Sequence, residues 1–283
     1  MEKSLLIPYA IVAVFGLAFG SFLNVCIARL PRKESVVTPR SRCPRCGHAI
    51  RWFDNIPALS YMVLRGRCRD CHVGISPVYP IVELLSAGIW VAAFSRASLS
   101  PEFIKTVTLD MLALIIVFTD LLERRVPHPI TVFGMGVGVL FSFLVPVDSR
   151  PLDWILRHIG FFPAGTSASI LGAIAGALAG GGLFYAVGEI FYFASGRQKE
   201  YLGFGDVMLM LMVGTFLGPA LTLMTILIGS LAGTFIALPL TVASPRFRNY
   251  EWPYATFLGT AAIVASLWGS SLLEAYLRWA GIA

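Results

Sequence analysis

Charged residues are scarce in this sequence. Only 13% of the 283 residues are Asp, Glu, Lys or Arg, whereas 57% are hydrophobic, and the mean hydropathy is +0.76. Soluble globular proteins carry about 25% charged residues, so this scarcity excludes an ordinary soluble domain. The composition instead predicts an all-α polytopic membrane protein, built as a helical bundle with one hydrophilic insertion.

Several other features are missing from the chain. Only five cysteines are present, and none lies in a segment predicted to be external, which argues against a disulfide-stabilised extracellular fold. We find no convincing internal repeat and no low-complexity linker. The first apolar run has no obvious small-residue cleavage site and is followed, not preceded, by its basic cluster, so we expect a retained span and not a signal peptide.

Apolar runs suggest about eight transmembrane helices, each near the length of about 20 residues that crosses a bilayer. Their approximate ranges are 7–28, 79–97, 103–122, 127–146, 167–193, 203–218, 220–242 and 254–278. The sequence therefore predicts a first transmembrane helix (1–28), a hydrophilic insertion (29–78) and a seven-helix membrane domain (79–283).

Positive charge is concentrated in the insertion. Between Arg29 and Gly74 ten Lys or Arg residues stand against three acidic residues. The positive-inside rule places this segment in the cytoplasm and the N-terminus outside. The same rule accounts for the net charge of +6, so no nucleic-acid partner is expected.

Two acidic residues lie near the predicted inner ends of apolar segments. Asp120 ends the third span, and Asp206 follows Gly203 and Gly205 at the start of the sixth. Burying an ionised side chain in an apolar segment costs free energy, so the presence of each acid there needs an explanation. Helix N-terminal stabilisation can explain Asp206 alone, whereas two carboxyl groups at matching depth predict a pair with one protonated and one ionised member.

A carboxyl pair of this kind is suited to peptide hydrolysis. The ionised member takes a proton from the attacking water, while the protonated member hydrogen-bonds the carbonyl oxygen. Gly203 and Gly205 would let an extended substrate backbone approach where a side chain would intrude. Asp110 lies deeper and is expected to make a polar contact between helices, with a proton-relay role as the alternative. Glu83 is expected to be structural or substrate-orienting.

The cysteines form a second pattern. Two C-x-x-C knuckles, about twenty residues apart, have the spacing of a four-thiolate zinc site. Their ligands would be Cys43, Cys46, Cys68 and Cys71. Two disulfides are the alternative, which the predicted reducing compartment disfavours. Cys26 lies in the first span and is expected only to pack, while His48 and His72 are expected to be solvated.

These residues together resemble type IV prepilin peptidases, bacterial membrane aspartic proteases that cleave leader peptides from prepilins and pseudopilins. Many members also N-methylate the new terminus. The resemblance covers most of the chain and rests on an ordered set of motifs: Gly20-Ser21-Phe22-Leu23-Asn24-Val25, Arg29-Leu30-Pro31, the two knuckles, Asp54-Asn55-Ile56-Pro57, Leu64-Arg65-Gly66-Arg67-Cys68, Ile75-Ser76, Tyr79-Pro80, Glu83-Leu84-Leu85, Asp120, and Lys199-Glu200 through Gly203-Phe204-Gly205-Asp206.

The resemblance implies that Asp120 and Asp206 are the catalytic pair. It further implies a bacterial inner-membrane location, a prepilin or pseudopilin helix as partner within the lipid bilayer, and S-adenosylmethionine as methyl donor beside zinc. No glycine-rich fingerprint for the donor is visible, and Arg65, Gly66 and Glu83 are its candidate ligands.

The chain departs from the family pattern at two places. Val126-Pro127-His128 stands where family members usually have Leu-Pro-Asp, and Met208 stands where Lys is common. These departures leave the acid pair intact. They put in doubt any role of the neighbouring positions in adjusting the pKa of the pair or in binding substrate.

Three other functions share part of the pattern. A presenilin-like intramembrane protease would use the same two acids, although the four-cysteine insertion favours prepilin processing. A proton-coupled transporter would use Asp110, Asp120 and Asp206 as a relay, and a zinc-bearing scaffold would need none of them. Cleavage of a purified prepilin separates the peptidase from the transporter and the scaffold.

Overall fold

The computed structural model describes residues 3–149, 152, 156, 158, 160, 163–194, 203–247 and 250–281. These residues are largely helical and contain no β-strand, only two isolated bridges. Five of the helices are long and apolar enough to cross a membrane. The prediction of an all-α polytopic membrane protein is therefore confirmed, while the count of eight spans stays a prediction.

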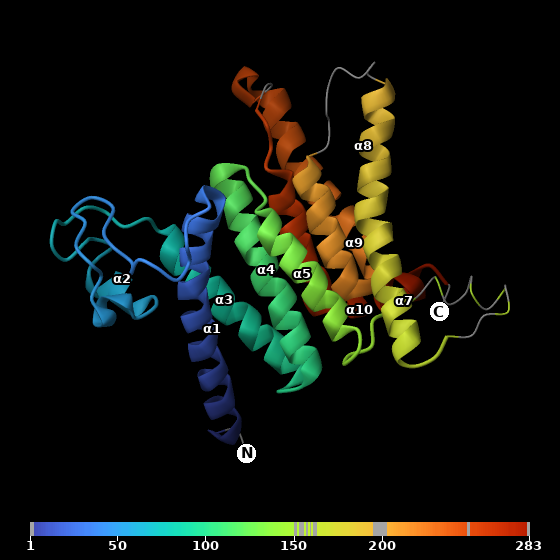
Figure 1. Cartoon of the computed structure of the whole chain (residues 1–283), viewed down its shortest axis with the longest axis horizontal. Helices are drawn as coiled ribbons and strands as arrows, with labels where there is room; N and C mark the ends of the chain where they lie inside the picture. The colour runs from blue at the N-terminus through green and yellow to red at the C-terminus, as the bar shows by residue number, and fades with distance from the viewer. Residues whose placement is uncertain are drawn as a thin grey trace. The chain divides into compact units, whose positions relative to one another are not determined.

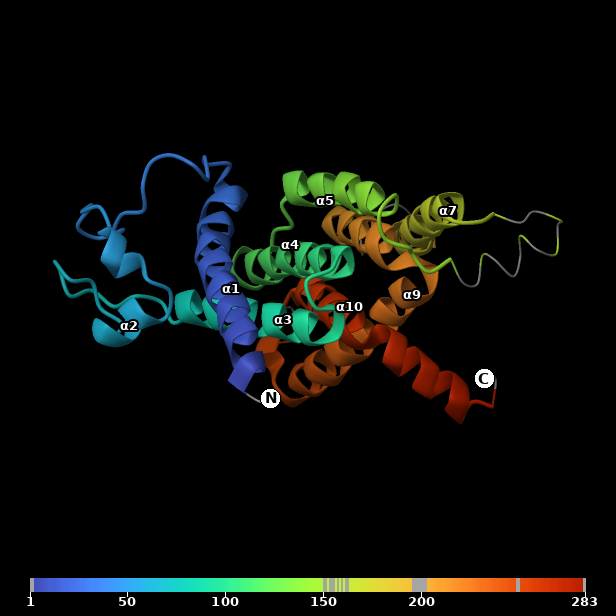
Figure 2. The ribbon, with the colours of Figure 1, turned by 90° about the horizontal axis from the view of Figure 1, so that it is seen from below.

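The hydrophilic insertion lies between the first two long helices, and the other described residues are mainly helical (Figures 1 and 2). In chain order they are α1 (Lys3–Arg29), η1 (Leu30–Arg32), η2 (Trp52–Asn55), α2 (Leu59–Val63), α3 (Val78–Ala97), α4 (Pro101–Glu123), α5 (His128–Phe141), α7 (Thr166–Ala177), the π-helix η3 (Leu178–Gly182), α8 (Leu183–Ala194), α9 (Phe204–Ala243), η4 (Pro245–Phe247) and α10 (Tyr254–Trp279).

The chain divides into two compact units, Met1–Phe103 and Ile104–Ala283. In the first unit α1 packs against α3. The two helices approach closely because α1 has glycine at the contact: a Cβ on Gly16 or Gly20 would lie 2.6 Å from the Cα of Ala87 or Glu83, respectively. Small residues play this role widely in membrane helix pairs, since lipid offers no hydrophobic drive for association.

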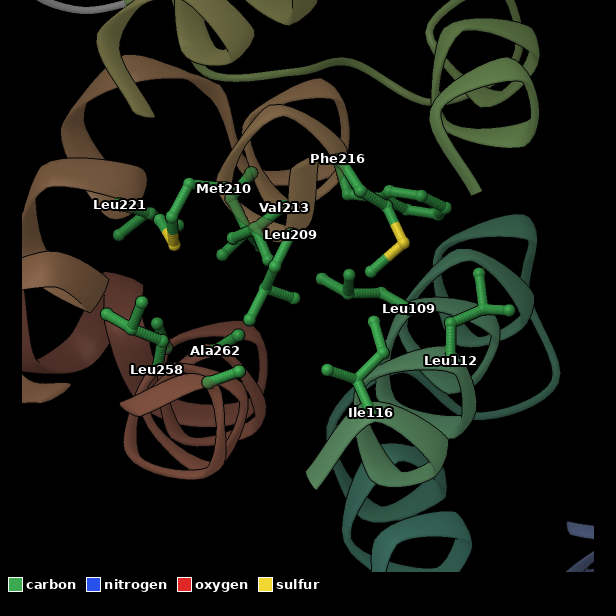
Figure 3. Packing of buried hydrophobic residues seen from close by; sticks show 14 of the residues in the cluster. Leu109, Leu112, Ile116, Leu209, Met210, Val213, Phe216, Leu221, Leu258 and Ala262 are labelled. Atoms are coloured by element: carbon green, nitrogen blue, oxygen red, sulfur yellow. The ribbon is translucent and has the colours of Figure 1, made fainter. Parts of the chain in front are cut away.

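In the second unit α9 is the central helix and contacts α5, α7, η3, α8 and α10. Its first half is apolar on every side, as expected of a helix surrounded by others. Figure 3 shows Leu109, Leu112 and Ile116 of α4 directed toward this helix. The buried cluster continues through Leu209, Met210, Val213 and Phe216 of α9 to Leu258 and Ala262 of α10. This core fixes α4, α9 and α10 together, and these helices carry the candidate acids and their neighbours.

Two predicted boundaries take a different form. The break at Gly218-Pro219 is present as a kink inside α9, where Gly218 has φ 75° and ψ 175°, so two predicted runs share one helix. The run 127–146 is helical only to Phe141. The chain then leaves the helix ahead of Pro146, which disfavours helical geometry in the residue before it. The Ser169 hydroxyl of α7 accepts from the N–H of Val147 at 3.0 Å and holds this segment.

Candidate active site and metal centre

Asp120 lies in the last turn of α4 and is only 6% exposed. Its Oδ2 accepts hydrogen bonds from the N–H and the hydroxyl of Thr256, at 2.7 and 2.9 Å. Thr256 is the third residue of α10, where a backbone N–H has no partner within its own helix. The end of α4 is thereby joined to the N-terminus of α10, and two protein donors hold the carboxyl group of Asp120.

A second tie joins the same two helices. The Ser266 hydroxyl of α10 donates to Oδ1 of Asp110, which is fully buried. The two ties are ten residues apart on both helices, from 110 to 120 on α4 and from 256 to 266 on α10. Between them Gly259 lies against Val117, whose Cγ2 would be 2.7 Å from an added Cβ. Asp110 therefore makes a polar contact between helices, and its Oδ2 has no partner among the described residues.

Asp206 is the third residue of α9 and is half-buried. Its N–H donates to the carbonyl of Gly203 at 2.9 Å, and its carboxyl group accepts from the Gly203 N–H. This is the geometry of an acid that caps the first turn of its own helix. Asp206 also interacts electrostatically with Asp120 and with Tyr254. The structure thus brings both predicted acids into one site within the second unit.

The two glycines before Asp206 have different surroundings. An added Cβ on Gly205 would lie 2.8 Å from Cβ of Val126, in the connection between α4 and α5. The same connection places the His128 ring 5.7 Å from the ring of Phe204. Gly203 is exposed, and among the described residues an added Cβ on it would meet only Oδ2 of Asp206, at 3.3 Å. Gly205 therefore packs closely against Val126, whereas Gly203 has no such close neighbour in the described part of the chain.

Sequence reasoning missed two residues of this site. Thr256 holds Asp120, and Tyr254 interacts with Asp206 while its hydroxyl lies 2.7 Å from that of Ser230. Neither carries a sequence signal, since a Thr in the first turn of an apolar helix is common. Lys199 and Glu200, which precede Gly203 in the family motif, lie outside the described residues.

The four predicted metal ligands lie together in the first unit. All four sulfur atoms are within 4.8 Å of one another, and Cys43 Sγ lies 3.7 Å from Cys71 Sγ. Four thiolates arranged tetrahedrally at the usual Zn–S distance of about 2.3 Å would be about 3.8 Å apart, so the cluster has the dimensions of a zinc site. Neither His48 nor His72 belongs to the group.

Both knuckles have the same backbone construction. In each knuckle the N–H of the first cysteine donates to the backbone carbonyl five residues later. Cys43 donates to His48 at 3.0 Å, and Cys68 donates to Val73 at 2.8 Å. The residue after each second cysteine is left-handed, with φ 73° at Gly47 and 56° at His72. In the first knuckle the N–H groups of Cys46 and Arg45 lower the pKa of the Cys43 thiol to about 6. A thiol held as thiolate near neutral pH is suited to bind a metal.

A bidentate ion pair supports the second knuckle. Arg69, between the two cysteines of that knuckle, donates to both carboxylate oxygens of Asp54 in η2, at distances of 2.6 to 3.1 Å. The hydrogen bond from Arg69 keeps the pKa of Asp54 below its usual range. Fork-to-fork pairing of this kind fixes orientation as well as position, so η2 and the knuckle are held in one arrangement.

A cavity of about 560 Å³ lies within the first unit. Among the candidate ligands for a methyl donor, Glu83 lines it, whereas Arg65 and Gly66 do not. Gly66 lies in a left-handed turn after α2 (φ 66°), where an added Cβ would be 2.9 Å from the hydroxyl of Tyr61. The structure therefore places Glu83 at a ligand-sized cavity and the other two candidates in the turn beyond it.

Comparisons with known proteins agree with this architecture. The Bacterial Peptidase A24 N-terminal domain matches residues 14–97, and the Type IV leader peptidase family matches residues 107–238. No solved structure matches the chain.

Three curated relatives are each named prepilin leader peptidase/N-methyltransferase. The relative from Myxococcus xanthus is 36% identical over 242 residues, which is 84% of this chain and 66% of the relative. The relative from Pseudomonas aeruginosa is 31% identical over 95% of this chain and 93% of its own length, and the one from Bacillus subtilis is 30% identical over 96% and 98%. With this identity over nearly the whole of two relatives, and with both domains matched in order, the chain belongs to the type IV leader peptidase family.

Proposed function

We propose that this chain is a membrane aspartic endopeptidase that removes the basic leader of type IV prepilins or pseudopilins. We further propose that it then N-methylates the new terminus with S-adenosylmethionine. The observation that carries the proposal is the interaction between Asp120 and Asp206 at two helix ends, in a chain whose relatives are named for both reactions.

In the proposed reaction the two carboxyl groups share one proton, because two negative charges at one site repel each other. Asp120 accepts two hydrogen bonds from Thr256 and is suited to be the ionised member. It takes a proton from water as the water oxygen attacks the scissile carbonyl carbon. Asp206 hydrogen-bonds the carbonyl oxygen, and a proton passes to the leaving amine as the C–N bond breaks.

The proposed orientation follows from charge. The basic insertion and both acids face the cytoplasm, and the N-terminus lies outside an inner membrane. A single-span substrate would keep its basic leader in the cytoplasm and its apolar segment in the bilayer. The peptide bond between them, after a glycine by family resemblance, would then reach Asp206 beside Gly203, which is exposed among the described residues.

The first unit would serve the cofactors. Cys43, Cys46, Cys68 and Cys71 would hold one zinc ion, which supplies folding free energy to an insertion with few buried apolar residues. The methyl donor would bind in the cavity of the first unit that Glu83 lines, with Arg65 and Gly66 as its candidate ligands.

Cleavage of a purified prepilin by the purified chain tests the peptidase. Asp120→Asn and Asp206→Asn should each lose at least about 100-fold in rate, because an amide cannot exchange the required proton. Asp110→Asn is the matched control, since it changes a carboxyl group on the same helix and should cost far less. Near-normal cleavage by a folded Asp120→Asn variant would contradict the paired-acid mechanism and favour the proton-relay transporter.

Methyl transfer should be separable from cleavage. Moving a methyl group from sulfur to an amine needs no pair of carboxyl groups, so Asp206→Asn should cleave poorly yet still methylate a precleaved pilin. Transfer of a labelled methyl group measures this. Absence of transfer by the wild-type chain would remove the second activity while leaving the first intact.

A further inference from the structure

Glu83 is a buried carboxylate without a positive neighbour. Its side chain belongs to a residue that is 7% exposed in α3. One oxygen accepts the Ala58 N–H at 2.7 Å, and the carboxyl group also hydrogen-bonds Ser21 of α1. Within the described part of the chain no Lys, Arg or His pairs with it. Burying a carboxylate without a cation is unfavourable. The site beside Glu83 is therefore suited to bind a cationic group.

The cavity beside Glu83 offers further acceptors. Ser21 and Asn24 of α1 line it together with Glu83. The Asn24 amide nitrogen donates to the carbonyl of Tyr79 at 3.0 Å, which leaves the amide oxygen as an acceptor. The cavity also has basic lining residues, but two of them are engaged. Arg29 donates to the carbonyls of residues 35 and 39, and Arg69 pairs with the carboxylate of residue 54.

Three residues with oxygen acceptors among those that line the cavity match a primary ammonium group, which has three N–H donors. Glu83 is in the second turn of α3, so at about 1.5 Å per residue it lies some 8 Å from the start of that helix. That depth is near a membrane boundary, where the new terminal amine of a cleaved single-span substrate would be.

Resting on the proposed methyl transfer, we propose that Glu83 binds the new N-terminal amine of the cleaved substrate and acts as the base for its methylation. Glu83 takes one proton from the ammonium, which leaves a neutral amine and a protonated carboxyl group. The nitrogen lone pair then forms a bond to the methyl carbon of a sulfonium donor as the C–S bond breaks. The sulfur keeps the bonding pair and leaves as a neutral thioether, and the product is a secondary ammonium.

Isosteric substitution separates this role from a structural one. Glu83→Gln keeps an oxygen for the Ala58 N–H but removes the charge, so methylation of a precleaved pilin should fall at least about 100-fold. Glu83→Asp keeps the charge at a shorter reach and should recover at least about tenfold over the Gln variant. Glu34→Gln is the matched control: Glu34 lines the same cavity but is exposed, and methylation should stay within about twofold of wild type.

Zinc content and prepilin cleavage, measured on the same preparations, report whether the variants are folded. If Glu83→Gln loses zinc and cleavage together with methylation, Glu83 is a structural tether and the proposal is wrong. The proposal is also overturned if folded Glu83→Gln methylates within about threefold of wild type, or if Glu83→Asp is no better than Glu83→Gln.

Binding without a methyl donor distinguishes the amine from the donor. In nanodiscs, precleaved pilin with a free terminus should bind the wild type about tenfold more tightly than the same pilin with an acetylated terminus, and Glu83→Gln should abolish the difference. A raised KM for S-adenosylmethionine with no change for pilin would assign Glu83 to the donor instead. If the wild type transfers no methyl group, methyl transfer itself fails, yet a preference for the free amine that Glu83→Gln abolishes would still show that Glu83 binds it.

Discussion

Thr256 determines how the carboxyl group of Asp120 is held. Its backbone N–H and its hydroxyl reach the same carboxylate oxygen, and the hydroxyl lies also 3.2 Å from the Val117 carbonyl. The hydroxyl can be removed by substitution while the N–H stays. Substitution of Thr256 therefore tests whether the position of the Asp120 carboxyl group affects catalysis while the carboxyl group itself is kept.

Thr256→Val should lower kcat for prepilin cleavage about tenfold with little change in KM. The reason is that a hydrogen bond to a charged group is worth about 1.5–3 kcal/mol, and the N–H retains part of the support. Thr256→Ser should stay near wild type because it keeps the hydroxyl. Steady-state kinetics on a purified prepilin measures both variants, and equal losses in Val and Ser would refute the role of the hydroxyl.

At this scale the sequence predicts the residues with unusual chemistry and misses those that hold them. Asp120, Asp206 and the four cysteines are conspicuous because an acid in an apolar segment and paired C-x-x-C knuckles are rare. Thr256 is an ordinary residue in sequence, and its contact with Asp120 spans 136 positions. Gly205 was expected to face a substrate, but its close neighbour is Val126, a long-range contact that no local pattern reveals.

Among the structural elements, the insertion is the one that the proposed zinc ion would stabilise. Cys43→Ser or Cys68→Ser should abolish binding of one zinc per chain and make residues 29–78 sensitive to protease, because the ligands join two knuckles with little apolar core. Cys26→Ser is the matched control, since Cys26 is buried in α1 outside the cluster. Metal analysis and limited proteolysis in detergent measure the outcome. Full zinc in a Cys43→Ser, Cys68→Ser double variant would disprove the assignment.

The contact between α7 and α9 is made by two glycines. A Cβ on Gly214 would overlap the carbonyl group of Gly176, and a Cβ on Gly176 would overlap the carbonyl oxygen of Gly214. Gly214→Ala should therefore destabilise the second unit by about 1–3 kcal/mol, the usual cost of overpacking. Gly136→Ala on α5 is the control, because no atom of the described residues lies within 4 Å of its added Cβ and the residue is exposed.

Thermal unfolding in detergent compares the two variants. A Gly214→Ala melting temperature equal to that of wild type would show that α7 and α9 separate without cost. In the sequence, Gly172, Gly176 and Gly180 lie at four-residue spacing, which predicts a close helix contact but not which helix makes it. The length of α5 and the continuity of α9 through Gly218 were likewise beyond a hydropathy count, because both depend on contacts with other helices.

For the whole molecule, the distribution of charge predicts its orientation. A cysteine at Val37 in the insertion should react with a membrane-impermeant maleimide only after cells are permeabilised, because positive loops stay inside. A cysteine at Leu99, between α3 and α4, should react in intact cells. Both positions are more than three-quarters exposed, so access to the reagent and not burial decides the result. Labelling of Val37→Cys from outside would invert the proposed topology.

The tie between Asp120 and Thr256 has a consequence for biosynthesis. The chain is made from its N-terminus, so Asp120 enters the membrane on α4 well before Asp206 arrives on α9. Thr256 follows only on α10, the last helix described. A nascent chain halted before residue 254 would hold both acids without the donors that position one of them. Proteolytic activity should therefore begin only after α10 has been made.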